Sequence, residues 1–325
     1  MSGESSTIRQ RRVATNGVEL DVLEAGDPSN PLVVLSHGFP ESSWSWRHQL
    51  PALAAAGYYA VAPDQRGYGR SSRPAEVSAY GIDHLCDDLL GVLDGEGRDQ
   101  AVFVGHDWGA LIVWELARLH PERVKAVVGV SVPFVQWPGP PTALMRAVWG
   151  DRFFYILYFQ TVGPAETELG ADPRRTMARV LWSASGDGFQ GPRAEIPPME
   201  GTGFLDLMSD PPSPLPAWLT DADIDHYAEQ FAASGFFGPV SYYRNLDANY
   251  ERIKDLPASR LSMPSFFIGG DKDGVIAMDP GGIDRMREAL PDFRGAVLLP
   301  GVGHWTQQEA PAAFNDALLG FLRSL

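Results

Sequence analysis

The sequence predicts an α/β fold, in which a mostly parallel, eight-stranded sheet is flanked by helices and carries an inserted helical cap. Short apolar runs alternate with helical patterns over most of the chain, which is typical of a parallel sheet wrapped by helices. The alternation is interrupted in the middle of the chain, where the sequence is aromatic, helical and rich in proline. We therefore expect a core domain made of 1–133 and 263–325 and a cap at 134–262, with a proline-rich loop at 192–216.

The predicted strands fall into two groups. An N-terminal hairpin is expected at 9–14 and 18–24, because the Asn16-Gly17 pair between them is a preferred two-residue turn. Later apolar runs such as LVVLSHG and AVFVGHD are short and uninterrupted, as expected for strands that are buried on both faces. These runs lie at 32–38, 59–64, 101–107, 126–132, 265–270 and 296–301.

Helical patterns follow most of these strands, at 46–56, 82–94, 108–119, 283–290 and 310–323. In the cap, helices are expected at 152–162 and 221–235, and no strand is expected. Thr220 precedes the second cap helix with Asp223 three residues later, which is the capping-box pattern, and Gly235 marks the end of that helix.

Charge and composition limit the partners. Forty-one acidic residues against twenty-six basic ones give a formal net charge of −15. Nucleic acids and anionic membranes both bind positive surfaces, so neither is expected as a partner, and an anionic substrate is disfavoured. The single cysteine, Cys86, excludes an internal disulfide, and no stretch resembles a signal peptide or a membrane span. These features predict a cytoplasmic protein and leave a homo-oligomer open.

The stretch VFVGHDWGA has the pattern of a nucleophile elbow, the sharp turn that presents a reactive side chain between a strand and a helix. Gly105 and Gly109 permit the close backbone approach that this turn requires, and Asp107 stands where esterases carry serine. An aspartate at such a junction is also a common helix cap, so the motif alone leaves both readings open.

Two later segments supply partners for Asp107. Such sites order nucleophile, acid and histidine along the chain. The segment FIGGDKDGVI offers Asp271 or Asp273 after one predicted strand, and LLPGVGHW places His304 after the next. Because the carboxyl ends of parallel strands meet at one sheet edge, we expect these side chains near Asp107. The other histidines lie in helical patterns or in turn motifs, so His304 is the candidate base.

The turn SHGFP after the first long strand supplies a candidate oxyanion hole. The backbone amides of Phe39 and Trp108 are expected to face the nucleophile, and a cis Phe39–Pro40 bond is compatible with this turn. Neighbouring features are interpreted as structural: Glu41 as a surface acid, His37 and His106 as hydrogen-bonding turn residues, and the glycine-rich loop 64–72 as packing.

Taken together, the motifs HGFP, GHDWGA, YFQTVGPAE, GGDKD and GVGHW resemble the α/β-hydrolase superfamily and, within it, the epoxide hydrolases. The resemblance covers nearly the whole chain. It implies that Asp273 rather than Asp271 is the acid that orients His304. It also implies that Tyr155 and Tyr243 in the cap donate protons to the leaving oxygen, although Tyr158 and Tyr242 are close neighbours of the same type.

A carboxylate nucleophile suits attack on an alkyl carbon. Serine would form an ether there, which histidine and water cannot cleave, whereas Asp107 forms an ester whose carbonyl is open to attack. Water activated by His304 would then release a vicinal diol from the ester. The expected substrate is an apolar or weakly polar epoxide, in a pocket walled by Phe39, Trp108 and Trp305 with aromatic residues of the cap. No cofactor or metal is expected.

Two other functions remain as alternatives. Haloalkane dehalogenases resemble this sequence too, and Trp108 matches one of their halide donors, but Phe39 replaces a residue that is often asparagine there. A hydrolase fold can also serve as a non-catalytic ligand-binding protein, although such a protein has no need of the full set of Asp107, Asp273 and His304. Among biological roles, detoxification, catabolism and turnover of lipid epoxides all stay open.

Overall fold

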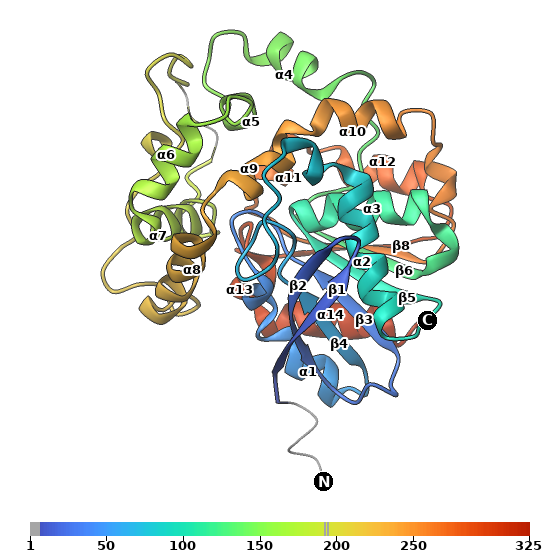
Figure 1. Cartoon of the computed structure of the whole chain (residues 1–325). Coiled ribbons are helices and arrows are strands. Elements are labelled where there is room, and N and C mark those ends of the chain that lie inside the picture. The colour runs from blue at the N-terminus through green and yellow to red at the C-terminus, as the bar shows by residue number, and fades with distance from the viewer. Residues whose placement is uncertain (1–6, 192, 194) are drawn as a thin grey trace.

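The computed structural model describes residues 7–191, 193 and 195–325. Within them, eight strands form one sheet in the order β1-β2-β4-β3-β5-β6-β7-β8 (Figure 1). The first two strands and β4 pair antiparallel, and all other pairs are parallel, which confirms the predicted mostly parallel sheet. The strands are β1 (Arg9–Thr15), β2 (Val18–Ala25), β3 (Leu32–Ser36), β4 (Tyr59–Pro63), β5 (Ala101–His106), β6 (Val124–Val130), β7 (Ser265–Gly270) and β8 (Phe293–Leu299).

The N-terminal hairpin turns as the sequence predicts. Asn16 and Gly17 have φ angles of 44° and 75°, and Thr15 pairs with Val18 across them. Both central residues of this turn need a positive φ, which asparagine and glycine adopt at little cost.

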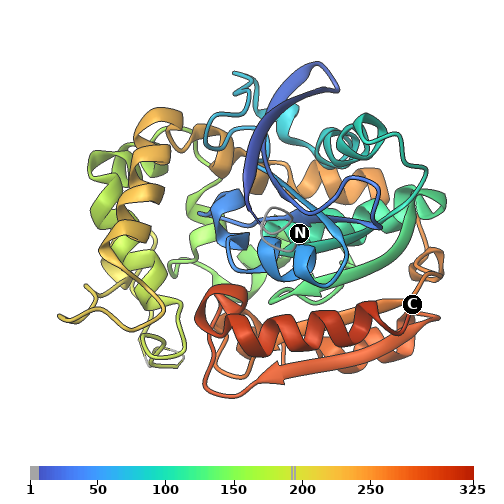
Figure 2. The same cartoon turned by 90° about the horizontal axis from the view of Figure 1, so that it is seen from below.

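Helices cover both faces of the sheet. Helices α1 (Gln49–Ala55) and α14 (Pro311–Leu322) pack on one face, and α2 (Ile82–Gly95) and α3 (Trp108–Leu119) pack on the other (Figure 2). Along β5, Val102 and Val104 belong to the first apolar layer, whereas Phe103 belongs to the second. Successive strand residues therefore serve opposite cores, which explains why β5 is apolar throughout.

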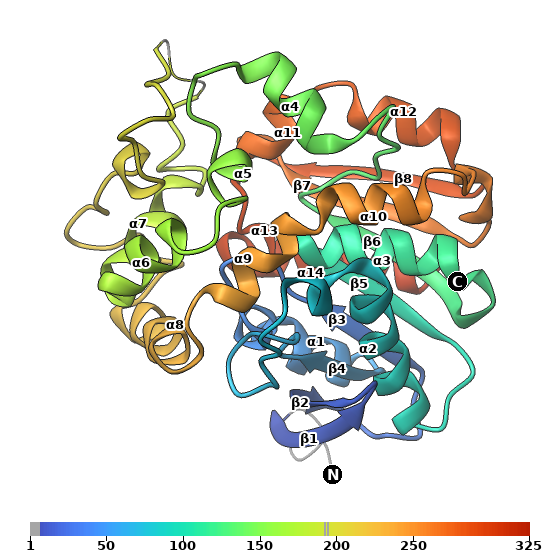
Figure 3. The same cartoon turned by 45° about the horizontal axis from the view of Figure 1, so that its top comes forward.

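Between β6 and β7 the chain forms helices and no strand among the described residues, apart from one isolated bridge. Helices α6, α7 and α8 lie together at one side of the sheet (Figures 1 and 3). The helices of this segment are α4 (Pro141–Trp149), α5 (Tyr155–Tyr158), α6 (Pro164–Ala171), α7 (Pro173–Ser183), α8 (Asp221–Ser234), α9 (Phe237–Arg244) and α10 (Leu246–Ile253). The domain boundaries near 133 and 263 stay a prediction, and residues 1–6, 192 and 194 lie outside the described part.

The predicted cap of α8 is confirmed. The Thr220 hydroxyl accepts the N–H of Asp223, whose carboxylate accepts the N–H of Thr220, and Gly235 follows the helix with a φ of 70°. Both ends are fixed locally, so the sequence pattern suffices to locate them.

The predicted helix at 152–162 is wrong. Only Tyr155–Tyr158 is helical there, because the Phe153 N–H donates to the Pro197 carbonyl and the Phe154 ring stacks on Trp149 at 4.5 Å. Tertiary contacts thus hold the first residues of this aromatic segment in an extended conformation. Across the described residues, the structure has no helix with both the length and the apolar character that crossing a membrane requires.

Candidate active site

Asp107 occupies a strained turn between β5 and α3. Its φ is 53° and its ψ is −115°, a conformation that non-glycine residues rarely adopt. A Cβ atom on Gly105 would overlap the backbone of Gly109, and one on Gly109 would overlap the backbone of Ser36. Both glycines are therefore required for the close approach of strand and helix, as the elbow motif predicts.

The turn after β3 supplies a hydrogen bond to this carboxylate. The Phe39 N–H donates to Asp107 Oδ1 at 2.8 Å, and the Phe39–Pro40 peptide bond is cis. The Trp108 N–H lies at the start of α3, next to Asp107 in the chain, and donates no hydrogen bond to another described residue. One of the two predicted amide donors thus contacts Asp107 in this structure.

His304 and Asp273 meet Asp107 at the carboxyl edge of the sheet. His304 follows β8, and its Nε2 atom lies 3.4 Å from Asp107 Oδ2. Its Nδ1 atom lies 3.1 Å from both carboxylate oxygens of Asp273, the residue that caps α11 (Gly274–Met278). Asp271, the competing acid, is exposed and accepts the N–H of Gly301. Sequence spacing alone left Asp271 and Asp273 as alternatives, and the structure shows that Asp273 is the one that contacts His304.

The charges in this cluster stabilise one another. Burial disfavours the cationic form of His304, but the carboxylates of Asp273 and Asp107 outweigh this effect and raise the pKa of His304 well above its usual value. Burial likewise disfavours ionised Asp107, but His304 and the Phe39 N–H outweigh that effect, so the pKa of Asp107 is lowered. At neutral pH, an ionised Asp107 therefore faces a cationic His304.

Tyr155 and Tyr243 contact each other and line the same cavity as Asp107. Their rings are 5.8 Å apart, and neither hydroxyl donates a hydrogen bond to another described residue. The neighbouring phenols differ in this respect, since the Tyr158 hydroxyl donates to Glu168 and the Tyr242 hydroxyl donates to the Arg66 carbonyl. Burial, followed by the charge of Asp107, raises the pKa of both Tyr155 and Tyr243. Both phenols therefore stay protonated at neutral pH.

A cavity of about 790 Å³ contains these side chains. Its wall is mostly apolar and comes from the sheet edge and from the helical segment, with Phe39 and Trp305 among the lining residues. Trp108 is absent from this lining, because its ring packs edge-on against Tyr242 and Tyr243. The remaining apolar wall includes Trp149, Phe153, Phe154, Val180, Phe189, Ile196, Phe204, Leu207, Met208 and Met278.

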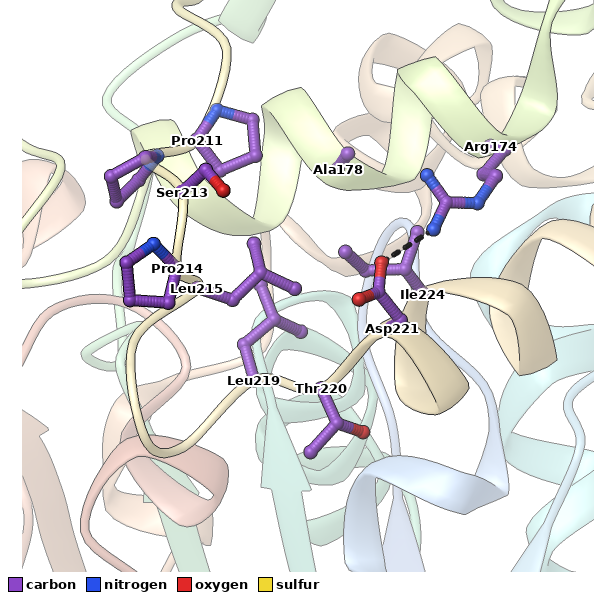
Figure 4. A pocket seen from close by; sticks show the side chains of 11 residues that line it. Arg174, Ala178, Pro211, Ser213, Pro214, Leu215, Leu219, Thr220, Asp221 and Ile224 are labelled. Atoms are coloured by element: carbon purple, nitrogen blue, oxygen red, sulfur yellow. Dashed lines mark hydrogen bonds and ion pairs between the residues drawn. The ribbon is translucent and has the colours of Figure 1, made fainter.

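A second hollow of about 550 Å³ lies on the surface between α7 and α8 (Figure 4). Its charged lining residues, Arg174 and Asp221, form an ion pair with each other, as the dashed line in Figure 4 marks. Prolines of the loop 211–214 form much of the rest. This hollow contains none of the predicted site residues, so the larger cavity is the candidate active site.

Glu41 is not the surface acid that the sequence suggested. Its side chain is fully buried, and it accepts hydrogen bonds from the Gln307 and Gln308 side chains at 3.2 and 2.6 Å. Its Oε2 atom lies 2.7 Å from Nδ1 of His106, whose Nε2 atom bonds the His304 carbonyl at 2.7 Å. Burial would raise the pKa of Glu41, but His106 outweighs burial and lowers it. A buried polar network thus connects Glu41 through His106 to the backbone of His304.

The other structural interpretations hold. His37 bonds its own turn through Gly38 and accepts the Gln65 N–H, and His106 serves the network described above. In the loop 64–72, Arg66 forms a buried ion pair with Asp88 on α2. Among the described residues, no group of three or more His, Cys, Asp or Glu side chains has the arrangement of a metal site.

Comparison with known proteins identifies the family. Residues 31–159 match the model of the alpha/beta hydrolase fold. Epoxide hydrolase A of Mycobacterium tuberculosis is 47% identical over 317 residues, which cover 97% of this chain and 98% of the relative. The epoxide hydrolase of Caballeronia sordidicola is 38% identical over 98% of this chain and 94% of the relative. This chain belongs to the epoxide hydrolase family.

Solved structures of epoxide hydrolases have the same fold. The crystal structure of epoxide hydrolase A from Mycobacterium thermoresistibile matches with a TM-score of 0.90 and 46% identity over 98% of each chain. An epoxide hydrolase from Vigna radiata matches with a TM-score of 0.88 and 36% identity over the full length of both chains. The resemblance drawn from the motifs is therefore confirmed, and neither the dehalogenase nor the binding-protein alternative is favoured.

Proposed function

We propose that this member of the epoxide hydrolase family converts an epoxide and water into a vicinal diol through a covalent ester on Asp107. One observation carries the residue assignment. A single cavity holds an ionised carboxylate that faces His304, together with the phenol groups of Tyr155 and Tyr243. Nucleophile, base and proton donors are thus within reach of one small substrate.

In the first step, a carboxylate oxygen of Asp107 attacks an epoxide carbon, and the bond from that carbon to the ring oxygen breaks. The oxygen leaves as an alkoxide and takes a proton from Tyr155 or Tyr243, while the other phenol hydrogen-bonds to it. The raised pKa values keep both phenols protonated until an alkoxide, a much stronger base than phenolate, forms beside them. The carboxylate needs no prior deprotonation.

Before the second step, His304 gives its proton to the phenolate through solvent. His304 then takes a proton from water, and the resulting hydroxide attacks the ester carbonyl of Asp107. The bond from that carbonyl carbon to the substrate oxygen breaks, the oxygen takes the proton from His304 and leaves as the second hydroxyl of the diol, and the proton of the restored Asp107 carboxyl group returns to His304. The Phe39 and Trp108 amides would hold the oxyanion that develops on the carboxyl group. Formation of the ester removes the negative charge of Asp107, which is one of the causes that raise the pKa of His304. Alkylation thus lowers the pKa of His304 and prepares it to act as a base, while Asp273 keeps it oriented and stabilises the cation that follows.

The substrate in this proposal is an apolar or weakly polar epoxide, because the wall of the 790 Å³ cavity is mostly apolar and the net charge is −15. Phe39 and Trp305 would contact it directly, with Trp108 behind Tyr243. A cytoplasmic location and a role in detoxification are the proposed cellular setting. No nucleic acid or membrane partner is proposed, and light scattering would decide between a monomer and a homo-oligomer.

The test is the intact mass of a His304→Gln variant after incubation with separate panels of epoxides and haloalkanes. Without the base, the ester should accumulate. An adduct with the mass of a whole epoxide, mapped to Asp107, is the expected result. A His304→Gln/Asp107→Asn double variant should give no adduct. A haloalkane adduct that lacks hydrogen halide would support the dehalogenase instead, and no adduct from either panel would refute covalent alkyl chemistry at this site.

A further inference from the structure

Glu309 is a partly buried carboxylate that the proposed chemistry does not use. It ends the short helix α13 (Thr306–Glu309), which follows His304. Its Oε2 atom accepts the N–H groups of Gly186 and Gly303 at 2.9 and 3.0 Å, and its Oε1 atom accepts the N–H of Trp305 at 3.0 Å. The carboxylate therefore holds the backbone on both sides of His304 and bonds a third residue far away in the sequence.

That third residue belongs to a second set of contacts with the His304 loop. The His304 N–H donates to the Ala184 carbonyl at 2.9 Å, and the Trp305 indole N–H donates to the Leu181 carbonyl at 2.6 Å. A Cβ atom on Gly186 or on Gly303 would overlap the backbone of the other segment. The loop 303–305 is thus packed directly on the end of α7, and Glu309 bridges the two segments.

On the core side, the same loop has separate support. The His304 carbonyl accepts hydrogen bonds from His106 Nε2 at 2.7 Å and from the Ser131 hydroxyl at 2.9 Å. These contacts leave the N–H groups of Gly303 and Trp305 without a partner other than Glu309 among the described residues. Loss of the carboxylate would leave these two N–H groups without an acceptor and would weaken the attachment of the loop to α7, while the bonds of the His304 backbone to Ala184, His106 and Ser131 remain.

We propose that Glu309 is a positioning residue for His304, and that it acts in the hydrolysis of the ester rather than in its formation. The proposal rests on the two-step reaction given above. Attack by Asp107 relies on the carboxylate, which Phe39 holds from the core, and on the phenols of Tyr155 and Tyr243. Ester hydrolysis instead requires the imidazole to reach both a water molecule and Asp273, so it is the step that is sensitive to a shift of the loop.

The test is rapid-quench kinetics of the full-length Glu309→Gln variant with styrene oxide, with intact mass as the readout. The fraction of enzyme that carries the adduct gives separate rates of alkylation and hydrolysis. A glutamine offers one acceptor oxygen, and its NH₂ group would face an N–H donor, so the loop should loosen. We expect hydrolysis to slow at least about tenfold and alkylation to change by less than about twofold, so that the adduct accumulates. The Glu309→Asp variant keeps both acceptor oxygens on a shorter side chain. Its rate of ester hydrolysis should lie between that of the Glu309→Gln variant and that of the unmodified protein.

Glu115→Gln is the matched control. Glu115 is a buried carboxylate on α3 that forms an ion pair with Arg118. Its side chain forms no hydrogen bond with the loop 303–305 among the described residues. Its substitution should lower stability and leave the adduct fraction as in the unmodified protein. If the rates of alkylation and hydrolysis in the Glu309→Gln variant change equally, or do not change, the positioning role is overturned. If the glutamine variant does not fold, the Glu309→Asp variant is judged by the same criterion. An unmodified protein that forms neither adduct nor diol from any epoxide would refute the proposed function instead.

Discussion

At the scale of single residues, the hydrogen-bond partners of a side chain decide whether it is available to a substrate, and its residue type alone does not. Two pairs of near neighbours in the sequence, Tyr155 with Tyr158 and Tyr242 with Tyr243, include two tyrosines that donate their hydroxyl protons to protein acceptors, namely Tyr158 and Tyr242. Tyr155 and Tyr243 donate to none of the described residues and remain available to a substrate oxygen. The assignment of proton donors therefore depends on unused hydrogen-bonding capacity.

Removal of either free hydroxyl should slow the opening of the epoxide. Tyr155→Phe and Tyr243→Phe should each lower kcat/KM by about 10²-fold, the lower end of what a positioned general acid contributes. Steady-state kinetics with a single epoxide measures this effect. Tyr158→Phe is the control, because it loses a bond to Glu168 and should cost about 1 kcal/mol of stability with little change in kcat/KM. Equal losses in all three variants would contradict the assignment.

The two steps should respond differently to pH. Alkylation needs ionised Asp107, whose pKa is lowered, so its rate falls only as the pH drops through that low value. It also needs protonated phenols, whose pKa values are raised, so it falls only at strongly alkaline pH. Pre-steady-state rates should show alkylation flat between about pH 5 and pH 9, while hydrolysis rises with pH as His304 in the ester form loses its proton. A loss of alkylation near neutral pH would contradict this scheme.

Some residues of the candidate site could be predicted from the sequence, and the role of Glu41 could not. Asp107, Asp273 and His304 follow strands that could be located from their apolar runs, so their meeting at one sheet edge was predictable. Glu41 was misjudged because its neighbours Gln307 and Gln308 lie more than 260 positions away in the chain. No local pattern distinguishes a buried, hydrogen-bonded acid from an exposed one when its partners come from another element.

At the scale of elements, the elbow depends on how closely β3, β5 and α3 approach. Gly109→Ala should destabilise the protein by about 1–3 kcal/mol, because the added methyl group overlaps the Ser36 backbone and forces β3 and α3 apart. Urea denaturation measures the change. Gly170→Ala in α6 is the matched control, since open space surrounds that position, and it should stabilise the protein by about 0.5–1 kcal/mol. Loss of stability in both variants would mean that the elbow is not specially crowded.

Elements of the core were predictable and several of the inserted segment were not. Buried parallel strands leave continuous apolar runs, and α8 carries both of its caps in its own sequence. The segment 152–162 reads as a helix, yet contacts with Trp149 and Pro197 keep its first residues extended. Helix α6 has only eight residues, and Asp172 alone separates it from α7, so the two helices do not give one helical period long enough to identify them.

At the scale of the whole molecule, the net charge of −15 acts on every approaching substrate. An epoxide that bears a carboxylate should be repelled, whereas its neutral methyl ester should not. We expect kcat/KM for the acid to rise several-fold as NaCl increases from about 10 mM to about 0.5 M, because salt screens the repulsion. The ester serves as the control and should change little. A salt response of the same size for both substrates would point to an effect on the protein itself.

The position of α7 between two hollows bears on how this enzyme can change over evolutionary time. One face of α7 lines the reaction cavity through Val180 and Ser183, and Ala178 lines the surface hollow. The carbonyls of Leu181 and of Ala184, which follows it, hold the His304 loop. Substitutions of the side chains of α7 can therefore reshape the substrate range, but any displacement of its axis would move His304. New specificities should arise in this lineage by exchange of wall residues on a fixed helix, with insertions confined to the loop beyond it.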